Sequence, residues 1–223
     1  MYVAGQACPV PRNARGVRGV RTALLSRTLF LLVLLLPSAC AGLAYQHMND
    51  PSRDEWQKPR EVITALAIQQ GERVADLGAG GGYFTWRLAE AVGPQGMVYA
   101  VEIDDTALGI IKSAMQSRGI VNVIPIRAQS NDAKLPELVD LVFSCDTYHH
   151  MEDRVAYFRL LARYLRPGGQ VAILDFHPHG FFSGLLGHGT AKEDVRREME
   201  AAGYRFVSDY SLVDAQHFQV FSR

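Results

Sequence analysis

Short apolar runs alternate with amphipathic stretches from residue 59 onward, a pattern typical of a parallel sheet with helices on its faces. We predict seven strands, over residues 73–77, 97–102, 121–127, 139–144, 170–175, 205–210 and 217–221. We predict five helices: one from residue 59 to a stop at Gly71, then 83–92, 106–118 and 154–165, and a last one that begins near residue 190 and ends at 202. The pattern therefore predicts an α/β fold.

Local signals define the ends of these elements. The stretch Arg166-Pro167-Gly168-Gly169 is a strong breaker, which we expect to separate the fourth helix from the fifth strand. Thr190 and Glu193 have the spacing of a capping box at the start of the last helix. The last two strands follow each other with no helix between them, which indicates an antiparallel pair. The predicted fold is a Rossmann-like, seven-stranded, mostly parallel sheet with helices on both faces and a C-terminal antiparallel hairpin.

The first 40 residues have a different pattern. An arginine-rich start is followed by the apolar run 29–36 and then by Pro37-Ser38-Ala39-Cys40. These are the three regions of a secretory signal, and small residues before a cysteine also resemble the bacterial lipobox. The apolar run is shorter than the roughly 20 residues that span a bilayer. We expect residues 1–40 to be a cleaved signal or lipid anchor at the cell envelope; an uncleaved membrane anchor and a misassigned start codon are the alternatives.

Composition and charge support one ordinary globular domain after this segment. Hydrophobic residues make up 48% of the chain and charged residues 21%. Residues 1–49 contain five arginines and no acidic residue, which leaves 18 basic against 23 acidic residues in the remainder, or about −5. A slightly acidic domain has no electrostatic footprint for nucleic acid. We expect a polar linker over residues 41–54 and one domain over residues 55–223, in which Cys145 is the single cysteine.

A glycine-rich run follows the first predicted strand. Residues 76–82 read Asp-Leu-Gly-Ala-Gly-Gly-Gly and open a predicted helix, which is the context that a nucleotide-binding glycine loop requires. Glycines there permit positive φ and a close approach of the backbone to a ligand. The N-terminus of the following helix supplies free N–H groups suited to a carboxylate or phosphate. Such a loop alone is also compatible with a tight strand-to-helix turn.

Two acidic residues narrow the choice of ligand. Asp76 stands at the end of the first strand, where a carboxylate would repel a pyrophosphate but would suit an ammonium group. Glu102 ends the second strand, 24 residues after Gly78, where an acidic side chain can accept both hydroxyls of a ribose. Tyr83 stands where a dinucleotide fingerprint has its last glycine. A ligand with an amine, a carboxylate and an unphosphorylated ribose fits these positions, so S-adenosylmethionine fits better than NAD.

The stretch from Val74 to Phe84 resembles the first motif of class I S-adenosylmethionine-dependent methyltransferases, and residues 98–104 resemble their second-strand motif. Residues 140–143 followed by His149-His150, and the run from Leu165 to Gly169, resemble the later motifs of the ubiquinone/menaquinone-type branch. The similarity covers roughly residues 55–223. It implies a methyltransferase whose cofactor is S-adenosylmethionine, and it is not specific for a substrate.

The resemblance implies how the cofactor would be held at its methionine and ribose ends. Asp76 and the first two loop glycines, Gly78 and Gly80, would contact the methionine portion, and Gly82 completes the G-x-G-x-G pattern. Glu102 would bind the ribose. These positions form the first half of the expected cofactor site.

The second half of the expected site concerns the adenine and the sulfur. Ile103 would pack on the adenine face. Gln129 stands near the position where the family often has an acidic residue for the adenine amine, and Asp132 is the nearest carboxylate. Ser144 and Cys145, at the end of the fourth strand, would lie near the sulfur of the cofactor.

Histidines supply candidates for a general base, which methyl transfer needs only if the acceptor must lose a proton. His149 and His150 follow the fourth strand, His177 and His179 follow the fifth, and His188 lies in the same loop. In the strand order of the family these two strands are neighbours, so the histidines would gather beside the methyl group. The alternatives are solvated loop residues or contacts that fix the loops. We expect no metal, because the spacing matches no zinc pattern.

Two segments are candidates for the acceptor side. The loop 177–189 carries apolar side chains among glycines and is interpreted as a lid, a packed loop or a membrane contact. Residues 56–59 either cover the pocket or lie on the surface. The predicted function is methyl transfer to a small, hydrophobic acceptor, with no nucleic-acid partner and with membrane association through the N-terminus. The alternatives are a protein carboxyl methyltransferase, a protein that binds S-adenosylmethionine without catalysis, an envelope-associated binding protein and a dehydrogenase.

Overall fold

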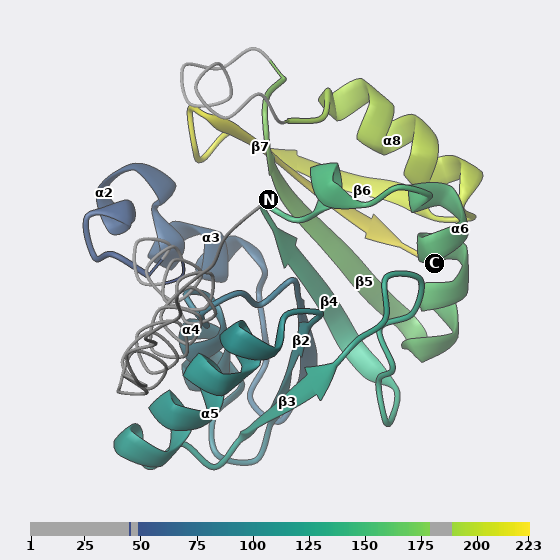
Figure 1. The fold of residues 1–223 in the computed structure, drawn as a ribbon. Coiled ribbons are helices and arrows are strands. Elements are labelled where there is room, and N and C mark those ends of the chain that lie inside the picture. The colour runs from purple at the N-terminus through teal and green to yellow at the C-terminus, as the bar shows by residue number, and fades with distance from the viewer. Residues whose placement is uncertain (1–44, 46–48, 179–188) are drawn as a thin grey trace, which may run out of the picture. The chain divides into compact units, whose positions relative to one another are not determined.

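A computed structural model describes residues 45, 49–178 and 189–223, in which seven strands form one sheet in the order β3-β2-β1-β4-β5-β7-β6 (Figure 1). The strands are β1 Arg73–Leu77, β2 Met97–Glu102, β3 Val123–Arg127, β4 Val139–Cys145, β5 Leu165–Phe176, β6 Arg205–Tyr210 and β7 Gln216–Ser222. β3, β2, β1, β4 and β5 are parallel, and β7 is antiparallel to both β5 and β6. The predicted Rossmann-like sheet with its C-terminal hairpin is confirmed.

Helices cover both faces of the sheet, as a sheet buried on both sides requires. They are α2 Arg53–Gln57, α3 Pro59–Ala65, α4 Thr85–Val92, α5 Asp105–Arg118, α6 Arg154–Leu161 and α8 Lys192–Ala201, with the 3₁₀-helices η1 Tyr148–His150 and η2 Ala162–Tyr164. The helices α3, α4 and α5 pack on one face, and α6 and α8 pack on the other (Figure 1). The prediction of helices on both faces is also confirmed.

The central strands are buried on both sides and hold their carboxyl ends in fixed positions. In β1, Val74 packs into the layer with α4, whereas Ala75 and Leu77 pack into the layer with α6, because successive strand residues point to opposite faces. Directly after β2, the side chain of Asp104 caps α5 by accepting from the N–H groups of Thr106 and Ala107. The loop that follows β2 is therefore fixed at the start of α5.

The predicted breaker at residues 166–169 does not separate a helix from a strand. β5 already begins at Leu165, and residues 166–169 bulge out of the ladder before pairing with β4 resumes at Gln170. Arg166 donates to both oxygens of the Asp140 carboxylate at 2.9 Å, which holds the bulge against β4. The prediction was wrong because a tertiary ion pair and a glycine at positive φ allow the strand to continue.

Two helix ends also differ from the prediction. α3 ends at Ala65 rather than at Gly71, and the residues between them form turns. The capping box is not formed, since Ala191 is the N-cap of α8 and no side chain caps this helix. The carbonyl oxygen of Thr190 instead lies 2.9 Å from Nε2 of His217, which fixes the start of α8 against β7.

The polar segment 41–54, predicted to be a linker, is described at Tyr45 and at residues 49–54. Asn49 donates to the Gly81 carbonyl, and α2 begins at Arg53, so these parts contact the domain. The predicted signal or anchor, residues 1–40, and the loop residues 179–188 lie outside the described residues. None of the helices that the structure describes is long and apolar enough to cross a membrane.

Candidate cofactor and acceptor site

The glycine-rich loop leaves the carboxyl end of β1 and leads into α4. Gly78, Gly80 and Gly82 have φ angles of 78°, 53° and 93°, a region in which a side chain is strained. Gly78 also lies against Thr147, because a Cβ added at Gly78 would be 2.0 Å from the Thr147 hydroxyl oxygen. Glycine is therefore needed here both for conformation and for close packing of the loop on the segment after β4.

Glu102 ends β2 beside this loop, and main-chain groups hold its carboxylate. The N–H of Gly80 donates to one oxygen at 2.9 Å. The N–H groups of Ile103 and Asp104 donate to the other oxygen at 2.6 and 3.0 Å. Because Glu102 stays partly exposed, this fixed carboxylate can also accept hydrogen bonds from the hydroxyl groups of a ligand.

Asp76 is the buried carboxylate of the site. It is 2% exposed, and the hydroxyl of Thr85 donates to it at 2.6 Å. Burial raises the pKa of Asp76 to about 7, and the charge of the nearby Glu102 acts in the same direction, whereas the hydrogen bond from Thr85 opposes them. A cationic group bound beside Asp76 would stabilise its ionised form, so this end of the site suits an ammonium group.

Two residues that precede α2 lie over the loop and the start of α5. The side-chain amide of Asn49 donates to the Gly81 carbonyl at 2.7 Å. The hydroxyl of Tyr45 hydrogen-bonds to the Asp104 carboxylate, which lies two residues after Glu102. The N–H of Asn49 donates to the carbonyl of Tyr45 at 3.2 Å, which joins the two residues. The sequence analysis gave neither residue a role.

Helix α2 is attached to the ends of β4 and β7 by a polar cluster. The Arg53 guanidinium pairs with the Asp146 carboxylate at 2.6 Å, and the two side chains are 12% and 13% exposed. Gln57 is fully buried and donates to Gln216 Oε1 at 3.0 Å and to Cys145 Sγ at 3.1 Å. Burial raises the pKa of Asp146, which the adjacent Arg53 partly offsets. This cluster forms one wall beside the end of β4.

Trp56 also belongs to the side of α2 that contacts the domain. Its ring stacks on Phe176 with 5.9 Å between centroids, and Phe176 in turn meets His149 edge-on at 6.5 Å. Trp56 and Phe176 are both half-buried. Of the two interpretations of residues 56–59, these contacts support the cover rather than a surface segment.

The three candidate histidines lie at the carboxyl ends of β4 and β5, but their surroundings differ. Nδ1 of His149 lies 2.6 Å from Oδ1 of Asp175, which is fully buried. His150 is exposed, and its ring lies 4.1 Å from that of His149. His177 is half-buried, 5.6 Å from the ring of His217. His149 is therefore the histidine that a buried carboxylate orients. The other two loop histidines, at 179 and 188, lie outside the described residues.

Two further predicted residues lie near the ends of the central strands. Ser144 is fully buried in β4, in register with Leu77 of β1. Ile103 is 56% exposed directly after Glu102, so it offers apolar surface where a flat ring can pack. Both positions are compatible with the predicted contacts to the sulfur and the adenine.

Asp132 follows β3, where its main chain pairs with that of Gln129 through hydrogen bonds of 2.9 and 3.1 Å. Its carboxylate accepts from Arg163 at 2.7 Å and from the Tyr164 hydroxyl at 2.8 Å. These two partners precede the amino end of β5, which is the edge of the sheet opposite to Glu102. The carboxylate of Asp132 is thus bound by side chains of η2, whereas Gln129 is exposed two residues after β3.

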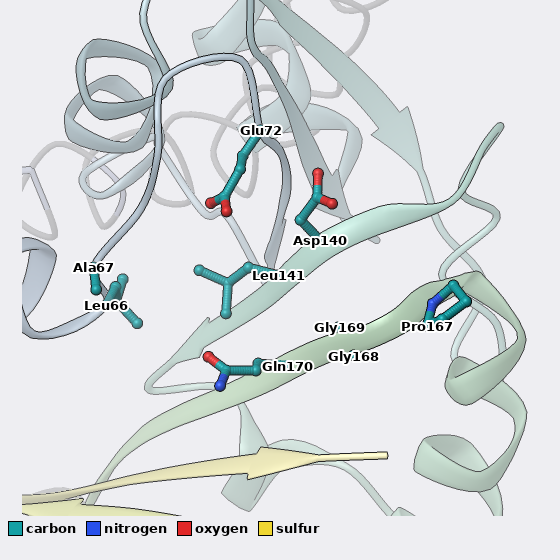
Figure 2. Close-up of a pocket in the computed structure, with 9 residues that line it drawn as sticks. All are labelled: Leu66, Ala67, Glu72, Asp140, Leu141, Pro167, Gly168, Gly169 and Gln170. Atoms are coloured by element: carbon teal, nitrogen blue, oxygen red, sulfur yellow. The ribbon is translucent and has the colours of Figure 1, made fainter.

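A separate hollow of about 230 Å³ lies at that opposite edge, near the bulge in β5 (Figure 2). Its lining residues are Leu66, Ala67, Glu72, Asp140, Leu141, Pro167, Gly168, Gly169 and Gln170. Asp140 there is bound by Arg166 and by the N–H of Arg73. Because Glu72 precedes β1 and Asp140 begins β4, the hollow is distant from the glycine-rich loop and is not part of the cofactor site.

Several residues of the site were not predicted from the sequence. Asp175 ends a predicted strand, as Glu102 does, so its position alone could have marked it. Arg53 and Gln57 had no such signal, because they lie in and next to the presumed linker and their partners are 93 and 159 residues away. Within residues 45, 49–178 and 189–223, no group of three or more histidine, cysteine or acidic side chains could hold a metal ion.

Comparison with known proteins gives a match in sequence. Residues 74–169 match the sequence model of a family described as a methyltransferase domain. The ubiquinone/menaquinone biosynthesis C-methyltransferase UbiE of Shewanella frigidimarina is 30% identical over 120 residues, which are 52% of this chain and 47% of the relative. The chain thus spans about half the length of the curated relatives that it matches.

Solved structures share the fold. A SAM-dependent methyltransferase from Aquifex aeolicus superposes with a TM-score of 0.75 at 23% identity, over 81% of this chain and 97% of that one. The [4+2]-cyclase SpnF superposes with a TM-score of 0.62 at 13% identity, over 73% of this chain and 78% of that one. At these identities the likeness concerns the fold, which is that of the methyltransferases with an antiparallel C-terminal strand.

Proposed function

We propose that the chain transfers a methyl group from S-adenosylmethionine to a small, hydrophobic acceptor, since residues 74–169 match a methyltransferase domain and the fold is that of the methyltransferases. The observation that carries the proposal is the pair of carboxylates at the ends of β1 and β2, on either side of the glycine-rich loop. In this assignment Glu102 accepts the ribose hydroxyls, and Asp76 with the loop N–H groups faces the methionine portion. Ile103 packs against the adenine.

The residues present fit this cofactor in charge and in hydrogen-bonding capacity. Asp76 is buried and suits an ammonium group, whereas Glu102 is fixed and partly exposed, which suits a pair of hydroxyls. The glycines at 78, 80 and 82 allow the positive φ angles that the loop adopts between the two carboxylates. When bound there, S-adenosylmethionine supplies a methyl group that is already activated by its sulfonium.

On the acceptor side, we assign the role of general base to His149. Asp175 accepts from Nδ1–H of this ring, so Nε2 carries the lone pair of the neutral imidazole. A base oriented in this way can take the proton from an acceptor that must lose one. Trp56 and Phe176 supply half-buried aromatic surface beside it, which supports a hydrophobic acceptor.

Calorimetry with the full chain tests the cofactor assignment. We expect wild type to bind S-adenosylmethionine and Glu102→Ala to bind it about 10- to 100-fold more weakly, because a hydrogen bond to a charged group is lost. Asp105→Ala is the matched control, since this carboxylate lies nearby at the start of α5 and its pair with Arg127 is exposed. Absence of binding by wild type would refute the proposal, and equal losses in both variants would refute the role of Glu102.

Transfer itself is tested by a radiolabelled methyl group offered with a broad panel of small acceptors. A second candidate, cofactor binding without methyl transfer, is supported by the likeness to SpnF, which is named as a cyclase, since one fold can serve different reactions. Binding without label in any acceptor would favour this second candidate. Label in protein as a base-labile ester would favour a protein carboxyl methyltransferase, whose branch also contains Gly82-Tyr83 and Val101-Glu102-Ile103.

We further propose that the chain works at the cell envelope, where residues 1–40 export it and Cys40 anchors it through a lipid. The support is the sequence pattern of an arginine-rich start, an apolar run and small residues before a cysteine. This location bears on the function, because S-adenosylmethionine is made in the cytoplasm.

A further inference from the structure

Next to His149, four buried side chains each have a polar atom without a hydrogen-bond partner among the described residues. The atoms are Ser144 Oγ, Asp175 Oδ2, His217 Nδ1 and Gln219 Oε1. All four residues are at most 3% exposed. Buried polar atoms in native proteins are nearly always paired with protein or with ordered water, so a group of four calls for a physical explanation.

The register of the sheet makes these residues neighbours. Asp175 of β5 and His217 of β7 are direct cross-strand partners, and Gln219 lies two residues farther along β7 on the same face. Ser144 of β4 is in register with Ile173, two residues before Asp175, and shares this face. Side chains directly opposite each other have Cβ atoms about 5 Å apart, and diagonal ones are about 7–8 Å apart. Asp175 and His217 are therefore side by side, and Ser144 and Gln219 are each diagonal to Asp175.

The hydrogen-bond inventory of the central pair explains why it lacks a direct bond. Nε2 of His217 lies 2.9 Å from the Thr190 carbonyl oxygen, which can only accept, so the ring proton is on Nε2 and Nδ1 has a lone pair. Asp175 Oδ2 is also an acceptor, since Oδ1 already faces His149. Two adjacent acceptors cannot bond to each other, but one water molecule can donate a hydrogen to each.

We propose that His217 is a positioning residue for the His149–Asp175 pair and acts through a buried water that donates to Asp175 Oδ2 and to His217 Nδ1. Only the part of this inference that makes His149 a base rests on the proposed function. With a partner on each oxygen, Asp175 has a fixed orientation and so holds the His149 ring in one tautomer. The donated hydrogen bond also stabilises the charge of Asp175, so this carboxylate is a weaker acceptor for the His149 N–H.

Other groups face this pair and must be considered in any titration. Burial lowers the pKa of His217, the charge of Asp175 acts in the opposite direction, and His177 and Asp209 also interact with His217. The charge of Asp175 also interacts electrostatically with Asp146, Tyr148 and Arg154. The ring of His150 packs against that of His149. The experiment therefore needs a control variant in which another neighbouring histidine is removed.

Titration of the full chain with ¹⁵N-labelled histidine, followed by NMR, tests the inference. We expect His217→Phe to raise the titration midpoint of His149 by about one pH unit, because the hydrogen bond to Asp175 Oδ2 is lost. In His217→Gln the amide can donate to Oδ2 directly, so the midpoint should stay near that of wild type. His177→Gln is the control, and it should leave the Asp175–His217 link in place. A midpoint that His217→Phe does not raise, or that His177→Gln raises equally, would overturn the proposal.

A crystal structure of the wild-type chain with S-adenosylhomocysteine is the second test, and it stands even if His217→Phe fails to fold. The expected result is an ordered water within hydrogen-bond distance of both Asp175 Oδ2 and His217 Nδ1. A direct contact between these atoms, or another side chain between them, would refute the inference. Neither readout needs turnover, so a chain that transfers no methyl group would refute the proposed function and leave this inference standing.

Discussion

Asp76 and Glu102 are carboxylates at neighbouring strand ends, but their surroundings give them different properties. Glu102 accepts three main-chain N–H groups and stays partly exposed, so its charge is stabilised where a ligand can reach it. Asp76 is almost completely buried. Among the described residues, Thr85 is the one side chain that donates a hydrogen bond to it. The same residue chemistry therefore provides a fixed acceptor at β2 and a carboxylate of raised pKa at β1.

The free energy of unfolding is expected to depend on pH through Asp76. Its folded-state pKa of about 7 lies above the ordinary 3.8, so the folded state binds more protons between these values. The stability from this group is fully present below about pH 4 and is lost as the pH rises through about 7. Asp76→Asn removes this dependence. In urea unfolding, the free energy of unfolding of wild type should therefore fall by about 3 kcal/mol relative to that of the variant between pH 5 and pH 8. The control Asp105→Asn should keep the pH dependence of wild type. If Asp76→Asn also keeps it, Asp76 does not change its ionisation on folding.

Gly78 gives a second test at the scale of residues, with Gly119 as its matched control. Both glycines have positive φ, 78° and 65°, so alanine is strained by about 1–2 kcal/mol at either position. A Cβ at Gly119 meets nothing within 4 Å, whereas at Gly78 it would lie 2.0 Å from the Thr147 hydroxyl oxygen. We expect Gly78→Ala to lower the free energy of unfolding by about 2 kcal/mol more than Gly119→Ala does and to abolish cofactor binding. Equal losses in urea unfolding would mean that Thr147 simply moves aside.

At the scale of elements, hydrophobic runs predicted β1, β2 and β6 with the bounds that the structure shows. β1 lies between Glu72 and Gly78, β2 begins after Gly96 and β6 ends before Ser211, so local sequence contributes to these strand ends. The start of β5 was missed because the pair between Arg166 and Asp140 lets the strand pass through a proline and two glycines. α2 was missed because its stabilising contacts are nonlocal and involve side chains at the ends of β4 and β7.

The attachment of α2 can be tested by a double-mutant cycle on Arg53 and Asp146. Arg53→Met leaves a largely buried carboxylate without its cation, so we expect a loss of about 3 kcal/mol and faster hydrogen exchange over residues 53–57. Asp146→Asn keeps a residue type that tolerates the observed φ of 53°. The double variant should lose at least about 1 kcal/mol less than the sum of the single losses.

Arg60→Met is the control for this cycle, because Arg60 is exposed at the start of α3 and carries the same charge. It should leave both the free energy of unfolding and the exchange of α2 close to wild type. Additive losses for Arg53 and Asp146 would show that the two side chains do not stabilise each other, and α2 would then depend on Gln57 and Trp56.

At the scale of the whole molecule, the sheet order brings distant segments to one edge. Because β1, β2, β4 and β5 are parallel, the glycine-rich loop, Glu102, His149 and Asp175 all lie at carboxyl ends of strands. The sequence predicted the loop, Glu102 and His149, and the position of Asp175 at the end of an apolar run could have marked it as well. It could not predict the partnership of Asp175 with His217, because the register between β5 and β7 is set by nonlocal pairing.

Whether the folded domain meets its cofactor depends on residues 1–40, which lie outside the described part of the chain. If Cys40 is lipidated, palmitate labelling of cells should place the labelled chain in the membrane fraction, and Cys40→Ala should abolish the label. Cys8→Ala is the matched control, because Cys8 precedes the apolar run and would be removed with a cleaved signal. Label that depends on Cys8, or no label in wild type, would contradict the lipid anchor. An unlabelled, uncleaved chain in the cytoplasmic fraction would contradict export as well, and it would place the domain where S-adenosylmethionine is made.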